Sequence, residues 1–497
     1  MLLTALAATG CSDNEAETAP AAAVAVEDVP VPPADGPKLL VTRHRTPVRE
    51  RPEPSATILG ELALGAQVAR SPEPISKSDC PAGWYAVRPR GFVCAEGTAT
   101  VDLAHPAAKS LQPPADRAMP YRYARVARGA AVSYAALPTP AEQAEAEPKG
   151  SPRAEEVEKL GLASNDVPLD GDGLPTGVAV LTPEGDGVGD DGYRTTASWF
   201  ATLPTTPLAA GATVATGHGE QTRVLKRRSG LALTGATRVD DRLFGITSDG
   251  RFIPVDRLEP DLGSIWHGER LDQVELPVGF ALRSGVGAYH IEKGNVERLD
   301  EDYEQHEAIP INGKFRTIGG VRYYFTKSEH WVRHKDIILL FGRRQFPDWA
   351  TPEQKWIDVS LANQTLIAWE GHKALFATLI SSGADRLGDP QTGPSTMQGV
   401  FRLRNKHITR DVDDREVGQA YSLGEAPWVL DFAEGFALAG CYWHERFGEA
   451  RSFHDVALSP IDAHWLWAWA APEVPEGWHS VAIPEDAEDN TIVYIHK

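Results

Sequence analysis

The chain has 497 residues, and 69 Asp plus Glu outweigh 49 Lys plus Arg to give a formal net charge of −20. At about 150 residues per domain this length suggests about three domains, and the acidic balance excludes a nucleic-acid-binding protein that tracks phosphates with a basic face. A hydrophobic content of 42% with 13 Trp excludes a wholly disordered chain, while 45 Gly and 38 Pro favour turn-rich β structure. No run of about 18 apolar residues occurs, so no membrane-spanning helix is expected.

The first apolar stretch of the chain ends at a cysteine. Residues 1–11, MLLTALAATGC, resemble the end of a bacterial lipoprotein signal, in which the cysteine (here Cys11) becomes lipidated. The resemblance implies a cell-envelope protein on the periplasmic side, attached to a membrane only by its lipid anchor, and Ser12 favours the outer membrane. Residues 12–37 are rich in Ala, Pro and acids without periodicity, which predicts a disordered tether. The alternative is an ordinary disordered end without lipidation.

Two of the four cysteines lie close together in the sequence. Cys80 and Cys94 flank a Trp-Tyr segment and are fourteen positions apart. In an oxidising envelope such a pair is expected to form a disulfide, which would stabilise its loop by about 3 kcal/mol in the chain-entropy model. The alternative is a pair of unbonded, buried thiols.

Residues 38–104 read as short alternating strands with Gly or Pro at each break. This segment resembles the bacterial SH3-like barrel. The resemblance rests on the stretch 48–52, the turn at 62–65, the Gly-Trp-Tyr strand at 83–85 and the closing Gly-Phe-Val at 91–93.

Two later segments, 231–258 and 319–337, end in a similar aromatic strand. We therefore expect a mixed β region over 120–258, which contains a linker over 138–192 and a second SH3-like segment. A third SH3-like segment is expected over 259–345. In envelope proteins such modules bind peptidoglycan or separate a catalytic domain from its anchor, and the sequence does not choose between these roles.

From about 355 the chain becomes a dense β pattern that opens with the hairpin IDVSLANQTLIAWEG. A Thr-Met-Gln-Gly-Val-Phe strand follows at 396–401, then the tract ALAGCYWHERFGEARSFHDVALSPIDAHWLWAW at 437–469 and the ending VPEGWHSV at 474–481. Residues 355–497 resemble the YkuD-type L,D-transpeptidase catalytic domain. The resemblance implies a β-sandwich or barrel-like fold with short helices, so the whole protein is expected to be mainly β. The apolar spacing at 462–469 predicts one of those helices.

The family resemblance also implies a chemistry. Its members transfer an acyl group between peptidoglycan stem peptides, using a cysteine nucleophile, a histidine and backbone N–H groups that stabilise the oxyanion. The family pattern is an early His on one strand, followed later by a Ser-His-Gly-Cys turn. Peptidoglycan is the expected partner, and no cofactor or metal is expected.

This sequence departs from that pattern at the reacting positions. Alignment on the LSP block places Ser452 on the family Ser, Phe453 on the His, His454 on the Gly and Asp455 on the Cys. The early His falls at Ala439. A carboxylate is a poor nucleophile toward an amide, because the mixed anhydride that it would form lies uphill. The usual chemistry of the family is therefore not expected.

One interpretation is a rebuilt active site with a relocated nucleophile. On a strand, Cys441 would share a face with Ala439 and point into the same cleft. Cys441 as nucleophile, His444 or His454 as base and Asp455 as orienting group would form a Cys-His-Asp arrangement. The alternative for Cys441 is a small buried strand residue.

The second interpretation, which we prefer, is a pseudo-enzyme that binds stem peptides without reacting. Trp443, Arg451 and Ser452 would line its substrate cleft, with Arg451 holding a stem carboxylate. The alternative for Arg451 is a surface salt bridge with Glu445 or Glu449.

Two further alternatives stay open. Four potential metal ligands, His444, His454, Asp455 and His464, lie close in sequence, but their spacing matches no recognised metal-binding motif. A role as a structural spacer or envelope-assembly partner is also compatible with the sequence, and protein partners are unknown.

Overall fold

The computed structural model describes residues 29–110, 112–113, 117–127, 129–147, 200, 203–217, 219–240, 242–385, 387–412 and 421–497. The expected lipoprotein signal, most of the expected tether and the part of the predicted linker beyond 147 lie outside the described residues. The described chain is mainly β, which confirms the predicted fold class. None of its helices is long and apolar enough to cross a membrane.

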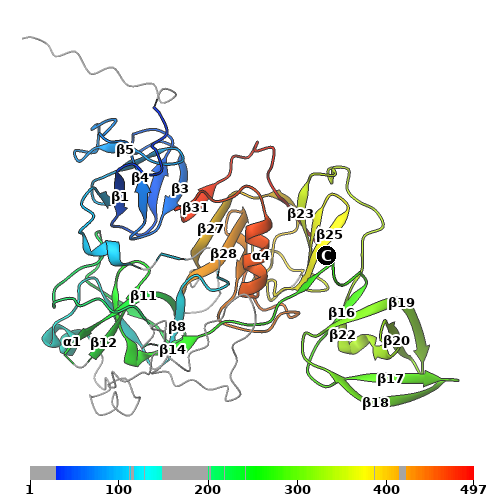
Figure 1. The fold of residues 1–497 in the computed structure, drawn as a ribbon. Coiled ribbons are helices and arrows are strands. Elements are labelled where there is room, and N and C mark those ends of the chain that lie inside the picture. Colours follow the sequence, from blue (N-terminus) through cyan, green and yellow to red (C-terminus); the bar gives the residue numbers. More distant parts are fainter. Residues whose placement is uncertain are drawn as a thin grey trace, which may run out of the picture.

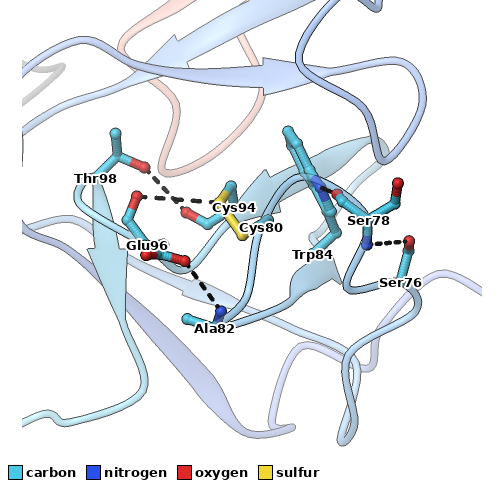
Figure 2. The surroundings of a disulfide bond; sticks show 8 residues. All are labelled: Ser76, Ser78, Cys80, Ala82, Trp84, Cys94, Glu96 and Thr98. Atoms are coloured by element: carbon cyan, nitrogen blue, oxygen red, sulfur yellow. Dashed lines mark hydrogen bonds between the residues drawn. A yellow bond between two sulfur atoms is a disulfide. The ribbon is translucent and has the colours of Figure 1, made fainter.

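The first unit, in blue in Figure 1, is a small β structure closed around an apolar core. Figure 2 shows the bond that joins Cys80 to Cys94, next to the Trp84 indole, which donates a 2.9 Å hydrogen bond to the Ser78 carbonyl. The elements of this unit are β1 (Lys38–Val41), β2 (Thr46–Arg49), β3 (Ile58–Leu62), β4 (Gln67–Ala69), β5 (Trp84–Ala86), β6 (Phe92–Cys94), β7 (Ala99–Thr100) and the 3₁₀ helix η2 (Pro106–Lys109).

The second unit is a curled sheet in the order β14-β8-β11-β12-β13-β9-β10. The first residues of the predicted linker form a helix instead, because Thr139 and Glu142 make a capping box at its start. Arg242 then pairs with Glu147 at 2.7 Å and fixes the chain just after that helix. The elements are β8 (Arg122–Val126), β9 (Ala131–Tyr134), α1 (Pro140–Ala146), β10 (Thr222–Leu225), β11 (Gly230–Val239), β12 (Arg242–Thr247), β13 (Phe252–Pro254), η3 (Val255–Arg257) and β14 (Leu258–Asp261).

The third unit is a seven-stranded sheet that lies on the side of the C-terminal unit away from the first two units (Figure 1). Trp266 and His306 attach its base to Phe447, with His306 Nε2 lying 3.0 Å from the Phe447 carbonyl oxygen. The elements are β16 (Val278–Ala281), β17 (Val286–Glu292), β18 (Asn295–Tyr303), β19 (Ala308–Ile318), β20 (Val321–Thr326), β21 (Trp331–Arg333), η4 (His334–Asp336) and β22 (Ile337–Leu340).

The C-terminal unit packs one sheet, β15-β25-β24-β23-β32-β26, against a second that runs β31-β27-β28-β29-β30. Helix α4 (Pro460–Trp469) forms as predicted, starts two residues earlier than expected, and is capped by Ser459. The strands are β15 (Glu269–Arg270), β23 (Lys355–Ser360), β24 (Thr365–Glu370), β25 (Lys373–Leu379), β26 (Gly399–Arg402), β27 (Asn405–Val412), β28 (Leu423–Ala433), β29 (Phe436–Gly440), β30 (Val456–Leu458), β31 (Ser480–Ala482) and β32 (Ile492–His496).

The C-terminal unit is joined to the first two units by backbone pairing. Strand β31 pairs with β27 on one side and with β3 of the first unit on the other. Just before β31, the Trp478 side chain is 2% exposed within the core of the first unit, where its indole donates to the Arg88 carbonyl at 3.1 Å. Gly230 at the start of β11 pairs in parallel with Leu423 of β28. The first, second and C-terminal units are therefore joined by hydrogen bonds between strands.

Candidate functional site

A cavity of about 340 Å³ opens in the C-terminal unit, where the family resemblance places the active site. Strands β29 and β30 form part of its wall, and they run parallel with Ala439 opposite Ala457. Its lining includes every aligned reacting position except that of His454, together with neighbouring side chains of the same tract: Ala439, Trp443, His444, Arg451, Ser452, Phe453 and Asp455. Residues that are distant in sequence also contribute, namely Arg228, Val412, Tyr421 and Leu423.

Asp455, which the sequence alignment places at the position of the family nucleophile, is held by a backbone N–H and by an arginine. Its Oδ1 accepts a 2.8 Å hydrogen bond from the Ala437 backbone N–H, and its Oδ2 lies 3.7 Å from Arg410 Nη2. Arg410 in turn places Nε 3.4 Å from Asp431 on β28. A carboxylate anchored between a backbone donor and a guanidinium serves charge balance rather than attack on a carbonyl carbon.

The His454 ring packs in an aromatic group instead of lining the cavity. Its centroid lies 4.3 Å from that of Phe453 and 5.0 Å from that of Phe436. The His454 backbone carbonyl accepts a 2.8 Å hydrogen bond from the Thr396 hydroxyl, which comes from the predicted strand at 396–401. These contacts hold the turn that precedes Asp455.

Cys441 is fully buried in an apolar cluster and is not among the residues that line the cavity. The strand ends at Gly440, so the alternation that would have put Cys441 on the face of Ala439 stops one residue too early. The thiol points to the His444 backbone carbonyl at 3.7 Å, and burial raises its pKa well above the ordinary range. A buried thiol with a raised pKa is inert as a nucleophile.

His444 lines the cavity but stays neutral near pH 7. Burial, together with the smaller effects of the Arg451 and Arg446 charges, lowers its pKa to about 4. Its Nδ1 accepts a hydrogen bond from the Arg446 backbone N–H at 3.2 Å. Arg451 lies 3.9 Å from Glu449, one of its two expected salt-bridge partners, and both side chains are about half exposed.

A second group of polar side chains, which the sequence did not reveal, lies where the first unit meets the C-terminal unit. We call His44, Arg45, Asp411, Glu425 and His479 the junction cluster. His44 Nε2 lies 2.9 Å from Glu425 Oε1, and Arg45 Nη2 lies 3.6 Å from both Glu425 Oε1 and Asp411 Oδ2. The Glu425 side chain is 3% exposed and that of His479 is 0% exposed.

The junction cluster contains the group of donors that could hold a metal ion in the described part of the chain. Single donor atoms of His44, Glu425 and His479 all lie within 4.8 Å of one another. However, His479 Nε2 lies 3.0 Å from the Thr409 carbonyl oxygen, which can only accept, so this nitrogen carries a hydrogen. The Arg45 cation also balances Glu425 without a metal. The hydrogen bonds and ion pairs therefore suit a buried structural junction.

Electrostatics supports this interpretation. Burial by itself would lower the pKa of His44, but the Glu425 carboxylate outweighs it and raises that pKa. Burial of Glu425 is likewise outweighed by His44 and Arg45, which hold its pKa well below the ordinary range. His479, in contrast, has a pKa that burial and the His44 charge lower to about 3. The raised pKa of His44 and the lowered pKa of Glu425 thus favour a charged pair beside a neutral His479.

The chain resembles solved L,D-transpeptidase structures over part of its length. No protein-family model matches the sequence, and no curated protein matches it. An L,D-transpeptidase from Xylanimonas cellulosilytica is similar at 18% identity and a TM-score of 0.22, over 31% of this chain and 65% of that chain. An L,D-transpeptidase from Stackebrandtia nassauensis is similar at 19% identity and a TM-score of 0.20, over 30% of this chain and 60% of that chain.

The catalytic domain of the E. faecium L,D-transpeptidase is covered more completely. Its similarity extends over 98% of that chain and 29% of this one, at 18% identity and a TM-score of 0.21. The present chain thus spans less than two thirds of the first two structures and nearly all of the third. Similarity at this level carries no functional conclusion by itself.

Proposed function

We propose that the C-terminal unit is an L,D-transpeptidase-type domain that binds peptidoglycan stem peptides and does not catalyse acyl transfer. The observation that carries the proposal is Asp455, which lines the cavity at the aligned position of the nucleophile and is ion-paired to Arg410. The neutral His444 and the aromatic Trp443 leave that cavity suited to contact with a peptide. The function is thus recognition of the polymer.

The placement of Cys441 supports the same proposal over the relocated-nucleophile alternative. A thiol that is 0% exposed and outside the cavity lining has no path to a peptide carbonyl. In this proposal the protein is a cell-envelope lipoprotein that is attached through Cys11 to the periplasmic face of the outer membrane. Its three SH3-like units add weak contacts with the polymer or act as spacers. Several weak contacts with a repeating polymer strengthen one another.

Retention on purified sacculi is the direct test of binding. We expect the full chain to sediment with sacculi and the Trp443→Ala, Arg451→Ala variant to be retained at least severalfold less. Equal retention of the two proteins would assign binding to the upstream units, and no retention of either would refute the proposal.

Acylation by a carbapenem tests the absence of chemistry, since by family resemblance this reagent modifies a cysteine transpeptidase. Intact mass spectrometry should show no adduct on the wild type or on Cys441→Ala. An adduct that disappears in Cys441→Ala would establish the relocated nucleophile instead. A variant that restores the family pattern, with Ala439→His, Phe453→His, His454→Gly and Asp455→Cys, provides the matched comparison and is expected to gain reactivity.

A further inference from the structure

The cavity is lined by a side chain that does not belong to the C-terminal unit. Arg228 comes from the turn between β10 and β11 of the second unit, yet it lines the same cavity as Asp455 and Arg451. Its charge also acts on Tyr421 of the C-terminal unit. Burial raises the pKa of that tyrosine, and the positive charge of Arg228 opposes this rise. The cavity is therefore built by two units.

The backbone fixes Arg228 at this place. Its φ is +74°, in the left-handed region that a long side chain rarely adopts, and its N–H donates to the Val126 carbonyl at 2.8 Å. Two residues later, the Gly230 N–H donates to the Ser422 carbonyl at 2.9 Å. An added Cβ at Gly230 would lie 2.2 Å from the Tyr442 hydroxyl, so the chain passes too close to the C-terminal unit for any side chain. Backbone strain held in this way is typical of functional positions.

The charge inside the cavity favours an anion, although the protein as a whole carries −20. Among the described residues that line it, Arg228 and Arg451 are cations and Asp455 is the carboxylate. Asp455 has Arg410 beside it, and Arg410 is not a lining residue. Glu449 lies 3.9 Å from Arg451, but a half-exposed pair of this kind is weak and can exchange partners. Two guanidinium groups thus remain for a ligand, and guanidinium matches a carboxylate in two-point geometry.

We propose that Arg228 and Arg451 together receive the C-terminal carboxylate of a stem peptide, so that the second unit takes part in ligand selection. The inference rests on the proposed function and adds a second arginine, from another unit, and the particular carboxylate that is recognised. The cavity volume of about 340 Å³ suits a short peptide end.

The test compares two probes on the full chain by fluorescence anisotropy at about 0.15 M salt, where long-range surface attraction is screened. One probe is a labelled stem tetrapeptide that ends in D-alanine with a free carboxylate, and the other is the same peptide as its C-terminal amide. We expect the wild type to bind the acid about tenfold more tightly than the amide. Arg228→Gln should weaken binding of the acid by about tenfold and remove the preference. Arg228→Lys should fall between the two, since it keeps the charge and loses the two-point geometry.

Arg227→Gln is the matched control, because it removes the same charge from the adjacent exposed residue, which does not line the cavity. It should leave both affinities within twofold. Equal binding of acid and amide by the wild type, or equal losses from Arg227→Gln and Arg228→Gln, would overturn the inference while peptide binding itself still stands. Retention on sacculi without binding of either peptide would also overturn it. Failure to bind both peptides and sacculi would instead refute the proposed function.

Discussion

The cavity and the junction cluster contain similar kinds of residues, yet their surroundings differ. The cavity is open, lined by Asp455 and a neutral His444, and Cys441 lies outside it. The junction cluster brings two imidazoles and a carboxylate within 4.8 Å, but these three groups, of His44, Glu425 and His479, are buried between two units, with 9%, 3% and 0% of their side chains exposed. Residue types that suggest catalysis are therefore found where no substrate reaches, and the accessible site lacks the nucleophile. Exposure and register, more than composition, separate a binding site from a structural one.

The largest effect is expected from removing the central carboxylate of the junction cluster. Glu425→Ala leaves the buried His44 without its counter-charge and leaves Arg45 with only the exposed Asp411, which should lower the free energy of unfolding by about 3–5 kcal/mol. Chemical denaturation followed by tryptophan fluorescence would measure this loss. The exposed Glu434→Ala serves as control and should change stability by less than about 0.5 kcal/mol. Equal effects of the two substitutions would show that the cluster does not hold the units together.

Asp455→Ala should have a smaller effect in the cavity. The substitution leaves the Ala437 N–H without its acceptor and removes the carboxylate that lies 3.7 Å from Arg410. We therefore expect the free energy of unfolding to fall by about 1–3 kcal/mol. Asp455→Asn keeps an acceptor for the N–H and should lose less. Thermal unfolding of the two variants would distinguish them, and an Asp455→Ala protein as destabilised as Glu425→Ala would erase the contrast between the two regions.

The pH dependence of stability should carry the signature of the junction cluster. His44 faces Glu425, Arg45, Asp411 and His479, and its pKa is raised, so its stabilising contribution is complete below pH 6.5 and is lost as pH rises through the raised value. His479 has its pKa lowered to about 3, so stability falls as pH drops from 6.5 toward 3. The melting temperature of the wild type should decline on both sides of about pH 6.5.

His44→Gln tests the assignment of the alkaline part of that curve. The glutamine variant should melt at a lower temperature than the wild type near pH 6 and approach it as pH rises through the raised pKa of His44. A variant that retains the full alkaline decline would place its origin in another titrating group.

The smallest effect is expected at Cys441. In the native protein, iodoacetamide should leave Cys441 unmodified over hours, because the thiol is buried and its pKa is raised. Peptide mapping of the native and the denatured protein separates this thiol from Cys11, and the denatured protein should be modified fully. Rapid modification of native Cys441 would mean that reagents reach the thiol from the cavity.

Local patterns predicted local structure well. The predicted hairpin is present, since β23 and β24 pair antiparallel around a turn in which Gln364 has a φ of +56°, and the helix forms close to its predicted start. Of the aligned positions, Ala439, Ser452, Phe453 and Asp455 line one cavity, and His454 does not. These features depend on residues that are near in sequence, where periodicity and turn chemistry act directly.

The remaining features depend on contacts between distant segments. His44 and Glu425 are 381 positions apart, and nothing in the neighbourhood of either residue indicates the other. The sequence around Arg228 gave no signal of a binding role, and its place in the cavity follows from the pairing of Gly230 with Leu423. The helix at the start of the predicted linker did have a local signal, the Thr139–Glu142 capping box, which an Ala- and Glu-rich composition obscured.

The Trp478 indole has a consequence for biogenesis. Its contact with Arg88 spans 390 residues, so the N-terminal unit leaves the ribosome long before the tryptophan that completes its interior has been synthesised. Until then the new chain exposes an unfilled apolar slot that chaperones or proteases can recognise. Maturation of the first unit is therefore timed by arrival of the last segment, and a chain that stops before residue 478 is exposed to degradation from its N-terminal end.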